Sequence, residues 1–306
     1  MNPANRPLLA MALRLGAVAV LATLTMAVKY TVDSGVAFVE ALFWRQVATV
    51  PILLGWLAWR REVARLKTRR LPAHFRRALM GAVGMGFTFG APVLLPLAEA
   101  TTLGFTTPIF AVIFSALLLG EKVGPYRWLA VILGFCGVLI IARPSADLPL
   151  LGTMVGTGAG VMVALISIQV RDLTRTDEPL SIVFWFAALS TPVLAIGLPF
   201  VAKAHTPEQW LLLGTLGVLG CIGQLLLTAS LRFGQVASVI VVDYTALVWA
   251  TLYGWMIWGE IPQGSTWFGA PLILAAGIVI VWREHRLGLL ERRQRATAGT
   301  LPSDAS

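Results

Sequence analysis

The sequence predicts an all-α membrane protein of ten transmembrane helices, arranged as two inverted five-helix repeats. Three observations lead to this prediction: an apolar composition, ten apolar runs of sufficient length, and a set of landmarks that occurs twice. Of the 306 residues, 57% are hydrophobic and 13% are charged, whereas soluble domains carry about 25% charged residues. The composition therefore excludes an ordinary soluble domain.

Ten apolar runs are long enough to cross a bilayer, whose ~30 Å core needs about 20 helical residues, or somewhat fewer where the bilayer adapts. Strand-type alternation is absent and glycine is abundant, which favours a helical bundle over an outer-membrane barrel. The expected spans are residues 8–28, 37–59, 78–98, 101–119, 126–142, 152–170, 180–201, 210–231, 236–258 and 266–282.

The first run also resembles a signal peptide, but Arg14 interrupts its apolar region and residues 25–29 make a poor cleavage site. We expect a retained helix, with a signal peptide as the alternative. Lys29 and Tyr30 at its end suit the outer membrane interface, where a lysine can snorkel and a tyrosine can anchor.

The run over residues 37–59 contains Arg45, about two turns inside the outer boundary. A cation at that depth costs ~2.5–3.5 kcal/mol even on the mildest insertion scale, so we expect Arg45 to point into the bundle. Farther along, Pro108 frees a carbonyl about a turn upstream, and the adjacent Thr106 and Thr107 offer a hydroxyl that can bond it. A weak point in the helix over residues 101–119 is expected there.

The net charge of +9 follows membrane topology rather than nucleic-acid binding. If the N-terminus is cytoplasmic, almost all basic residues fall in cytoplasmic segments, eight of them between residues 60 and 77, and only Lys29, Arg143 and Lys203 fall outside. This asymmetry is what the positive-inside rule predicts. We expect both termini in the cytoplasm and no nucleic-acid partner, and we interpret residues 60–77 as a topology determinant rather than a special binding segment.

No metal, disulfide or catalytic pattern is present. Cys136 and Cys221 lie inside apolar runs, and His74, His205 and His285 are expected in loops, so neither ligand spacing nor a disulfide framework can be identified. We expect no metal, no cofactor and no catalytic residue.

Landmarks in the first half recur about 140 residues later. The segment from Phe43 to Pro51 matches that from Phe184 to Pro192, and GVLIIAR, which begins at Gly137, matches GIVIVWR. A Gly-Glu pair that ends at Glu121 has a counterpart that ends at Glu260. Since five helices per repeat is an odd number, the second copy must be inverted, with Glu121 facing the cytoplasm and Glu260 facing outward. Inverted repeats are an architecture of secondary transporters, with the substrate site near the midplane between the halves.

These landmarks resemble the EamA family of the drug/metabolite transporter superfamily. The residues that carry the resemblance are Arg45, the short turn over residues 98–101, Gly120-Glu121, GVLIIARP and the second-half counterparts, and it covers residues 8–284. It implies five-helix repeats at residues 8–144 and 150–284, a basic cytoplasmic tail at residues 285–306, and alternating-access transport of a small organic metabolite across an inner membrane.

The candidate substrate-cavity residues are polar or charged positions within the expected spans. Asp243 can carry a proton, bind a cationic substrate group or form a structural ion pair, and its depth leaves a direct pair with Arg45 open. We take it as the proton-coupling candidate. The full candidate set is Arg45, Thr88, Thr107, Gln224, Asp243 and Tyr244.

Other features keep two interpretations. The glycines at 214, 217, 220 and 223 serve either tight helix packing, which we favour, or a substrate-lining groove. Glu99, Glu121 and Glu260 are either interfacial structural residues or coupling sites.

The predicted function is a secondary transporter of a small metabolite, an amino acid or amino-acid-derived compound, in the direction of export across a bacterial inner membrane. The alternatives are an importer of a nucleotide-like or flavin-type cofactor metabolite, an intramembrane lipid-processing enzyme, and a non-transporting scaffold. The expected partners are the metabolite and the lipid bilayer, with a homodimer as one possible assembly.

Overall fold

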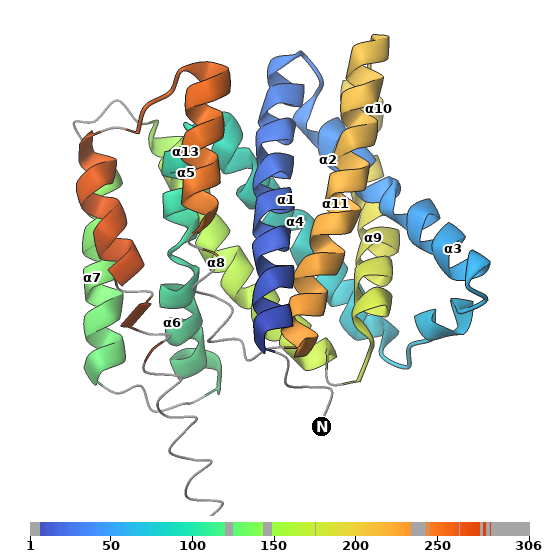
Figure 1. Cartoon of the computed structure of the whole chain (residues 1–306), viewed down its shortest axis with the longest axis horizontal. Helices are drawn as coiled ribbons and strands as arrows, with labels where there is room; N and C mark the ends of the chain where they lie inside the picture. The colour runs from blue at the N-terminus through green and yellow to red at the C-terminus, as the bar shows by residue number, and fades with distance from the viewer. Residues whose placement is uncertain are drawn as a thin grey trace, which may run out of the picture.

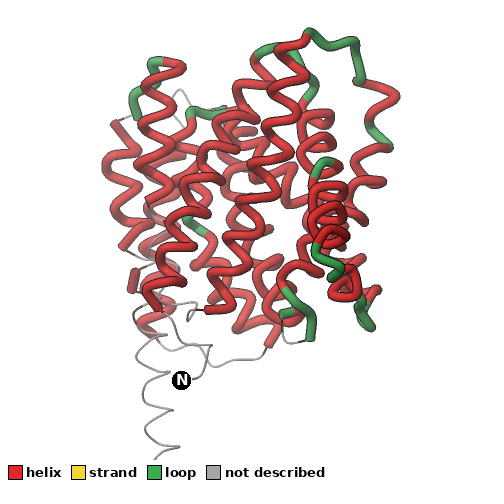
Figure 2. The backbone as a smooth tube through the Cα atoms, turned by 45° about the vertical axis from the view of Figure 1, so that its right-hand side comes forward, coloured by secondary structure: helices red, strands yellow, loops and turns green. Residues whose placement is uncertain are grey.

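The computed structural model is a bundle of helices, most of which run between the two ends of the molecule (Figures 1 and 2). It describes residues 7–119, 125–142, 149–174, 176–233, 243, 245–262, 264–275, 278–279 and 282. None of these residues forms a β-strand, which confirms the all-α prediction.

The helices have the following bounds in chain order. They are α1 (Pro7–Asp33), α2 (Phe38–Val47), α3 (Thr49–Trp59), η1 (Val63–Leu66), α4 (Leu71–Leu94), α5 (Leu97–Gly104), α6 (Thr107–Leu119), α7 (Pro125–Ala142), α8 (Leu150–Leu173), α9 (Pro179–Ala195), α10 (Leu198–Val201), α11 (Pro207–Phe233), α13 (Ala246–Tyr253) and the π-helical turn η3 (Gly254–Trp258). Residues 264–275 are also helical.

Five helical stretches are long and apolar enough to cross a membrane. They overlap with five of the expected spans, with ends that differ by up to seven residues, and are Met11–Asp33, Phe38–Trp59, Leu71–Leu94, Leu150–Val170 and Pro207–Ser230. The other expected spans contain shorter or interrupted helices within the described residues. The ten-helix count and the inverted repeat therefore stay predictions.

Prolines explain why some of the expected spans are divided into two helices. Pro51 has no N–H to bond the Val47 carbonyl, and α2 gives way to α3 at Ala48. Leu95 adopts an extended conformation with φ −132° and ψ 160° because it precedes Pro96, and α4 ends there.

The break between α5 and α6 has the form that the sequence predicts. Pro108 cannot donate to the Gly104 carbonyl, and the Thr107 hydroxyl donates to that oxygen instead at 2.8 Å. The Thr106 hydroxyl likewise donates to the Leu103 carbonyl at 2.7 Å. The predicted weak point is confirmed.

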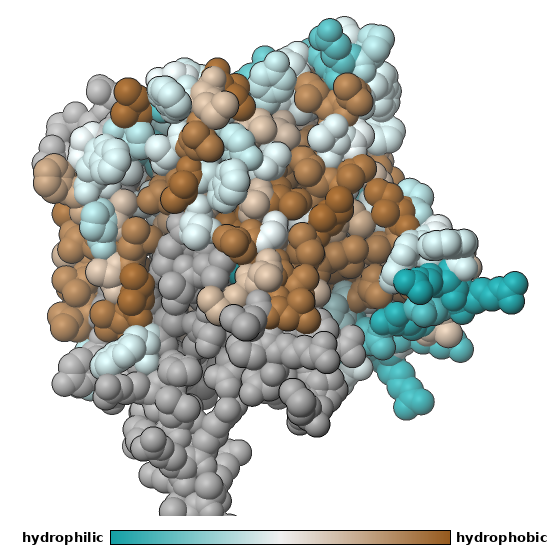
Figure 3. Space-filling model, in the orientation of Figure 1, coloured by the Kyte–Doolittle hydropathy of each residue, from teal (hydrophilic) through white to brown (hydrophobic). Residues whose placement is uncertain are grey.

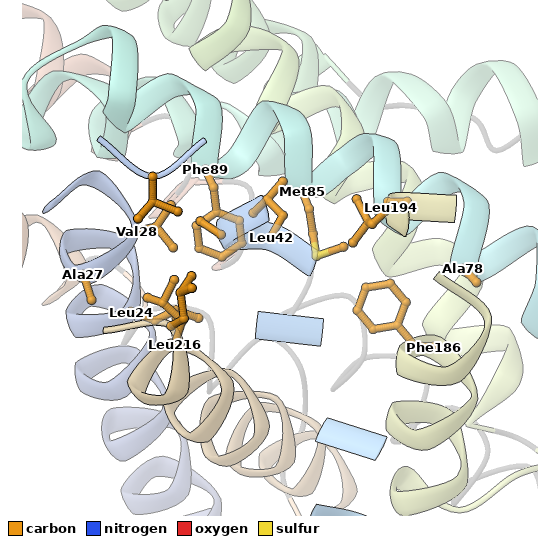
Figure 4. Close-up of a cluster of buried hydrophobic side chains, with 14 residues drawn as sticks. Leu24, Ala27, Val28, Leu42, Ala78, Met85, Phe89, Phe186, Leu194 and Leu216 are labelled. Atoms are coloured by element: carbon orange, nitrogen blue, oxygen red, sulfur yellow. The ribbon is translucent and has the colours of Figure 1, made fainter. Parts of the chain in front are cut away.

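Helices from the N-terminal part of the chain pack mainly against helices from the C-terminal part. α1 lies along α11, α4 lies along α8 and α9, and α2 contacts both α9 and α11 (Figure 1). A buried apolar cluster fills the space between them, with Leu24 and Val28 from α1, Met85 and Phe89 from α4, and Phe186 from α9 (Figure 4).

The outer surface of the bundle is apolar over its middle. Figure 3 shows hydrophobic side chains across the visible face and hydrophilic ones gathered at the upper edge and the lower right. Large apolar side chains such as Phe200 and Phe268 are 85% and 74% exposed. Since exposed apolar area of this extent marks a membrane or protein contact, the surface fits a lipid environment.

Candidate functional site

Arg45 lies in the interior of the bundle, as the sequence predicts. The residue is 1% exposed. Its Nη1 donates to Gln46 Oε1 at 2.9 Å and to the Met85 sulfur at 2.8 Å, and the guanidinium carbon stands 4.9 Å from the Phe89 ring centroid. Within the described part of the chain no carboxylate pairs with Arg45, so a cation sits among an amide, a thioether and an aromatic ring.

A second buried arginine, Arg77, lies near the first. The expectation that it belongs to a cytoplasmic loop is wrong: α4 starts at Leu71 rather than at residue 78, with Pro72 suiting its first turn. Arg77 is 7% exposed, and its guanidinium carbon stands 4.2 Å from the Phe186 ring centroid. The side chain therefore stacks on an aromatic face inside the bundle.

Gln46, the neighbour of Arg45 on α2, connects Arg45 to α9 through hydrogen bonds. Its Nε2 donates to Ser190 Oγ at 2.8 Å, and that hydroxyl donates to the Phe186 carbonyl at 2.6 Å. In Figure 4, Met85 and Phe89 project from α4 and Phe186 projects from α9 toward a common space. We call Arg45, Arg77, Met85, Phe89 and Phe186 the arginine cluster.

Asp243 pairs with Arg14 rather than with Arg45. Arg14 Nε and Nη2 donate to the two carboxylate oxygens of Asp243, each at 2.5 Å. The two side chains are 11% and 30% exposed. Arg14 thus has a partner in the second half of the chain, and the proton-coupling candidate already holds an ion pair.

Lys29 does not snorkel to the interface as expected. It is 6% exposed, and its Nζ donates to Glu260 Oε1 at 2.9 Å and to the Leu95 carbonyl at 3.2 Å. The ammonium also stands 4.8 Å from the ring centroid of Trp258. Burial beside a carboxylate satisfies the charge without exposure to water, so Glu260 acts as a structural partner here.

Two further acidic residues are buried near the same end of the bundle. Glu40 Oε1 lies 2.6 Å from His205 Nε2, with side chains that are 5% and 3% exposed. Glu99 is fully buried and accepts a bond from Thr266 Oγ1 at 3.2 Å. Both residues lie inside the fold rather than at an exposed interface.

The basic segment between α3 and α4 makes specific contacts with the last turn of α8 and with the connection from α8 to α9. Arg65 pairs with Glu178 at 2.7 Å and Arg70 pairs with Asp172 at 2.5 Å. Farther in, His74 Nε2 lies 3.4 Å from Asp177 Oδ1. His74 is buried in α4, so its expected place in a loop is wrong.

The remaining candidates lie in separate neighbourhoods. Thr88 on α4 and Gln224 on α11 are half-buried, and Thr107 occupies the break before α6. Tyr244, the Gly120-Glu121 pair and the tail at residues 285–306 lie outside the described residues. The structure brings Arg45 into a cluster with residues that the sequence did not single out, and it does not join the whole candidate set.

The glycines of α11 serve packing. A Cβ at Gly217 would overlap Ala48, and one at Gly220 would lie 2.9 Å from Arg45 Cγ. A Cβ at Gly223 would lie 2.6 Å from Leu21. The packing interpretation is confirmed at these three positions, whereas Gly214 has open space around it.

No group of three or more potential metal ligands forms among the residues that the structure describes. A shallow hollow of about 460 Å³ lies at one end of the bundle, between the end of α1 and the start of α11. It is lined by Tyr30, Ser34, Thr206, Glu208, Gln209, Leu211 and Leu212. None of the candidate residues lines it.

Comparisons with known proteins agree on one family. The model of the EamA-like transporter family matches residues 8–143 and again residues 150–282. A riboflavin transporter of Vibrio cholerae is 31% identical over 76% of this chain and 78% of its own. The pseudopaline exporter CntI of Pseudomonas aeruginosa is 32% identical over 79% of this chain and 85% of its own.

Two further comparisons concern a less similar sequence and a solved structure. An S-adenosylmethionine uptake transporter of Rickettsia bellii is 28% identical over 81% of this chain and 84% of its own. A solved crystal structure aligns with 91% of this chain and 98% of its own, with a TM-score of 0.62 and 21% identity, and thus shares the fold. With its apolar helices and a family match over nearly its whole length, the chain is a multi-pass membrane protein that belongs to the EamA-like transporter family.

Proposed function

We propose that this protein is a secondary transporter that moves a small organic metabolite across the bacterial inner membrane by alternating access. The proposed cargo is an amino acid or an amino-acid-derived compound, the direction is export, and both termini face the cytoplasm. Family membership and a relative that is named an exporter support this proposal. The family and the relatives' names also indicate a transporter rather than the intramembrane enzyme considered from the sequence.

One structural observation carries the mechanism. Among the described residues, four long-range ion pairs and two histidine–carboxylate contacts join a residue of the first family match to a residue of the second. The pairs are Arg14–Asp243, Lys29–Glu260, Glu40–His205, Arg65–Glu178, Arg70–Asp172 and His74–Asp177. If residues 8–144 and 150–284 are two inverted repeats that move against each other, these pairs are the contacts that the movement must break and restore.

The ion pairs lie toward both ends of the bundle. Arg14 and Lys29 are both on α1, and a helix rise of 1.5 Å per residue separates them by about 22 Å along its axis. Pairs at each end suit a transporter that opens one side while the other stays closed. In this proposal Asp243 exchanges Arg14 for a proton during the cycle, which couples transport to the proton gradient.

A second candidate is the import of a flavin-type metabolite, because a relative at 31% identity is a riboflavin transporter. A thermal-shift screen of the purified protein against amino acids, their derivatives and riboflavin would rank the ligands. Flux of each stabilising compound into proteoliposomes, with protein-free liposomes as the control, then decides between the candidates. Saturable, gradient-driven accumulation is expected, and chemical conversion of the compound without accumulation would overturn the transporter proposal.

A further inference from the structure

The arginine cluster contains two buried cations that have no carboxylate partner among the residues that the structure describes. Lys29, another buried cation of the described interior, faces the carboxylate of Glu260 at 2.9 Å. Arg45 and Arg77 contact an amide, a thioether and two aromatic rings instead. Removing a charge from water without a counterion is costly, so the burial of these two arginines needs a physical explanation.

Several donors of the two guanidinium groups are unsatisfied. Arg45 Nε and Arg77 Nε and Nη1 are buried and have no hydrogen-bond acceptor among the described residues. A thioether sulfur, the Met85 contact of Arg45, is only a weak acceptor. A guanidinium presents its N–H groups in a planar fork that matches the oxygens of a carboxylate or a phosphate, so these donors suit an oxyanion.

The cluster follows one face of α4. Arg77, Gly81, Met85 and Phe89 are spaced four residues apart and thus lie above one another on the helix. A side chain at Gly81 would overlap both Arg77 Nη1 and the Phe186 ring. On α11, which packs against α2, a Cβ at Gly220 would lie 2.9 Å from Arg45 Cγ. Two glycines therefore keep room for the guanidinium groups.

The two guanidinium groups carry like charges within one buried cluster, so they repel each other. An anion bound between them would turn this repulsion into two attractions. A bound anion would thus make the electrostatics of the cluster favourable, which is what a binding site for a charged substrate needs.

We propose that Arg45 and Arg77 together bind an oxyanion group of the substrate, a carboxylate or a phosphate, while Met85, Phe89 and Phe186 contact its apolar part. This inference rests on the proposed transport function. It names the substrate class as an amphipathic organic anion and assigns Arg77 a role that the sequence did not suggest.

The binding test uses purified full-length protein in a neutral detergent and three probes: 3-phenylpropionate, phenyl phosphate and the uncharged 3-phenylpropionamide. At millimolar concentration, at least one of the two anions is expected to raise the unfolding midpoint by a few degrees, and the amide is expected to have little effect. Equal shifts with the amide and the anions, or no shift with either anion, would overturn the proposal.

The matched variants are Arg77→Met and Arg76→Met. Arg76 is exposed on the same helix, one residue away, so it controls for the loss of a charge. Because Arg77 lacks a counterion, Arg77→Met should keep or raise the midpoint of the ligand-free protein and should abolish the shift with the anion. Retention of the anion shift in Arg77→Met would contradict the assignment. Gly81→Ala, which displaces both Arg77 and Phe186, gives a second test and should weaken anion binding at least tenfold.

Failure of this inference is distinguishable from failure of the proposed function. Binding in detergent requires no transport, so an anion shift that depends on Arg77, without flux in proteoliposomes, would support the site and contradict transport. Flux of a neutral compound that is unaffected by Arg45→Met and Arg77→Met would support transport and overturn the site.

Discussion

Arg14 on α1 and Asp243 form a two-bond ion pair across 229 positions of sequence, with both N···O distances at 2.5 Å. Bidentate pairs of this kind are among the stronger hydrogen-bonded contacts in proteins. The pair connects Asp243, just before α13, to the first helix of the bundle. In the proposed cycle, breaking this pair releases the two segments from each other.

We predict that Asp243→Asn abolishes the pH dependence of flux and destabilises the protein by about 1–3 kcal/mol, because Arg14 is left partly buried without its carboxylate. The measurements are proteoliposome flux between pH 5.5 and 8 and the unfolding midpoint. Adding Arg14→Gln to Asp243→Asn should recover part of the stability but not the pH response. Unchanged flux and an unchanged pH response in Asp243→Asn would exclude a coupling role.

Two glycines of α11 should respond in opposite directions to the same substitution. In Gly220→Ala the new methyl group would lie 2.9 Å from Arg45 Cγ, and overpacking of this kind costs about 1–3 kcal/mol. Gly214 has open space, so Gly214→Ala should stabilise the helix by up to about 1 kcal/mol. Unfolding midpoints of the two variants test this, and a destabilised Gly214→Ala beside a neutral Gly220→Ala would refute the packing at this interface.

Asp177 predicts a specific acid sensitivity. Burial raises the pKa of its carboxyl group, but hydrogen bonds from Thr176 and Thr68 and the nearby His74 ring outweigh burial, so the pKa lies below its ordinary value of 3.8. A lowered pKa in the folded state stabilises the protein fully above the ordinary value, and this contribution disappears as the pH falls through the lower, folded-state value.

The stability difference between the protein and its Asp177→Asn variant should therefore be about 1 kcal/mol at pH 6 and should shrink as the pH falls below 4. Tryptophan fluorescence during thermal unfolding at pH 6, 5, 4 and 3 measures it. Asp172→Asn is the control, because its pair with Arg70 is half-exposed and exposed pairs contribute less. A stability difference that grows toward pH 3 would contradict a lowered pKa for Asp177 in the folded protein.

Cysteine labelling in intact cells tests the predicted topology. Arg61 and Lys203 are both exposed, in connections that follow α3 and α10. In a background with Cys136 and Cys221 replaced, Lys203→Cys should react with a membrane-impermeant maleimide, and Arg61→Cys should react only after the cells are opened. Labelling of both positions from outside would refute the orientation with a cytoplasmic N-terminus.

The sequence predicted the parts of the fold that depend on local chemistry. Apolar length identified the long helices, and Pro108 with Thr107 predicted the break before α6 together with the hydroxyl that bonds the freed carbonyl. The burial of Arg45 followed from the cost of a charge in lipid. Each of these inferences needs only neighbouring residues and a membrane.

The residues that pair with the buried charges could not be predicted from the sequence. Arg14 and Lys29 are charges within an apolar run, a signal that each needs a counterion, but Asp243 and Glu260 lie more than 200 positions away. Arg77 and His74 looked like loop residues because a charged stretch ordinarily marks a loop. These two side chains are buried because α4 packs against α9, which the sequence alone does not show.

The most direct test of the central claim is reversible crosslinking of the two halves of the chain during transport. In the cysteine-free background, Arg70→Cys with Asp172→Cys spans one end, and Ser34→Cys with Gln209→Cys spans the other, where Gln209 Nε2 bonds the Ser34 carbonyl at 2.9 Å. The corresponding single-cysteine variants serve as controls. The account predicts that a short, cleavable bifunctional thiol reagent at either end stops flux and that reductant restores it. Wild-type flux through fully crosslinked protein would contradict alternating access between these halves.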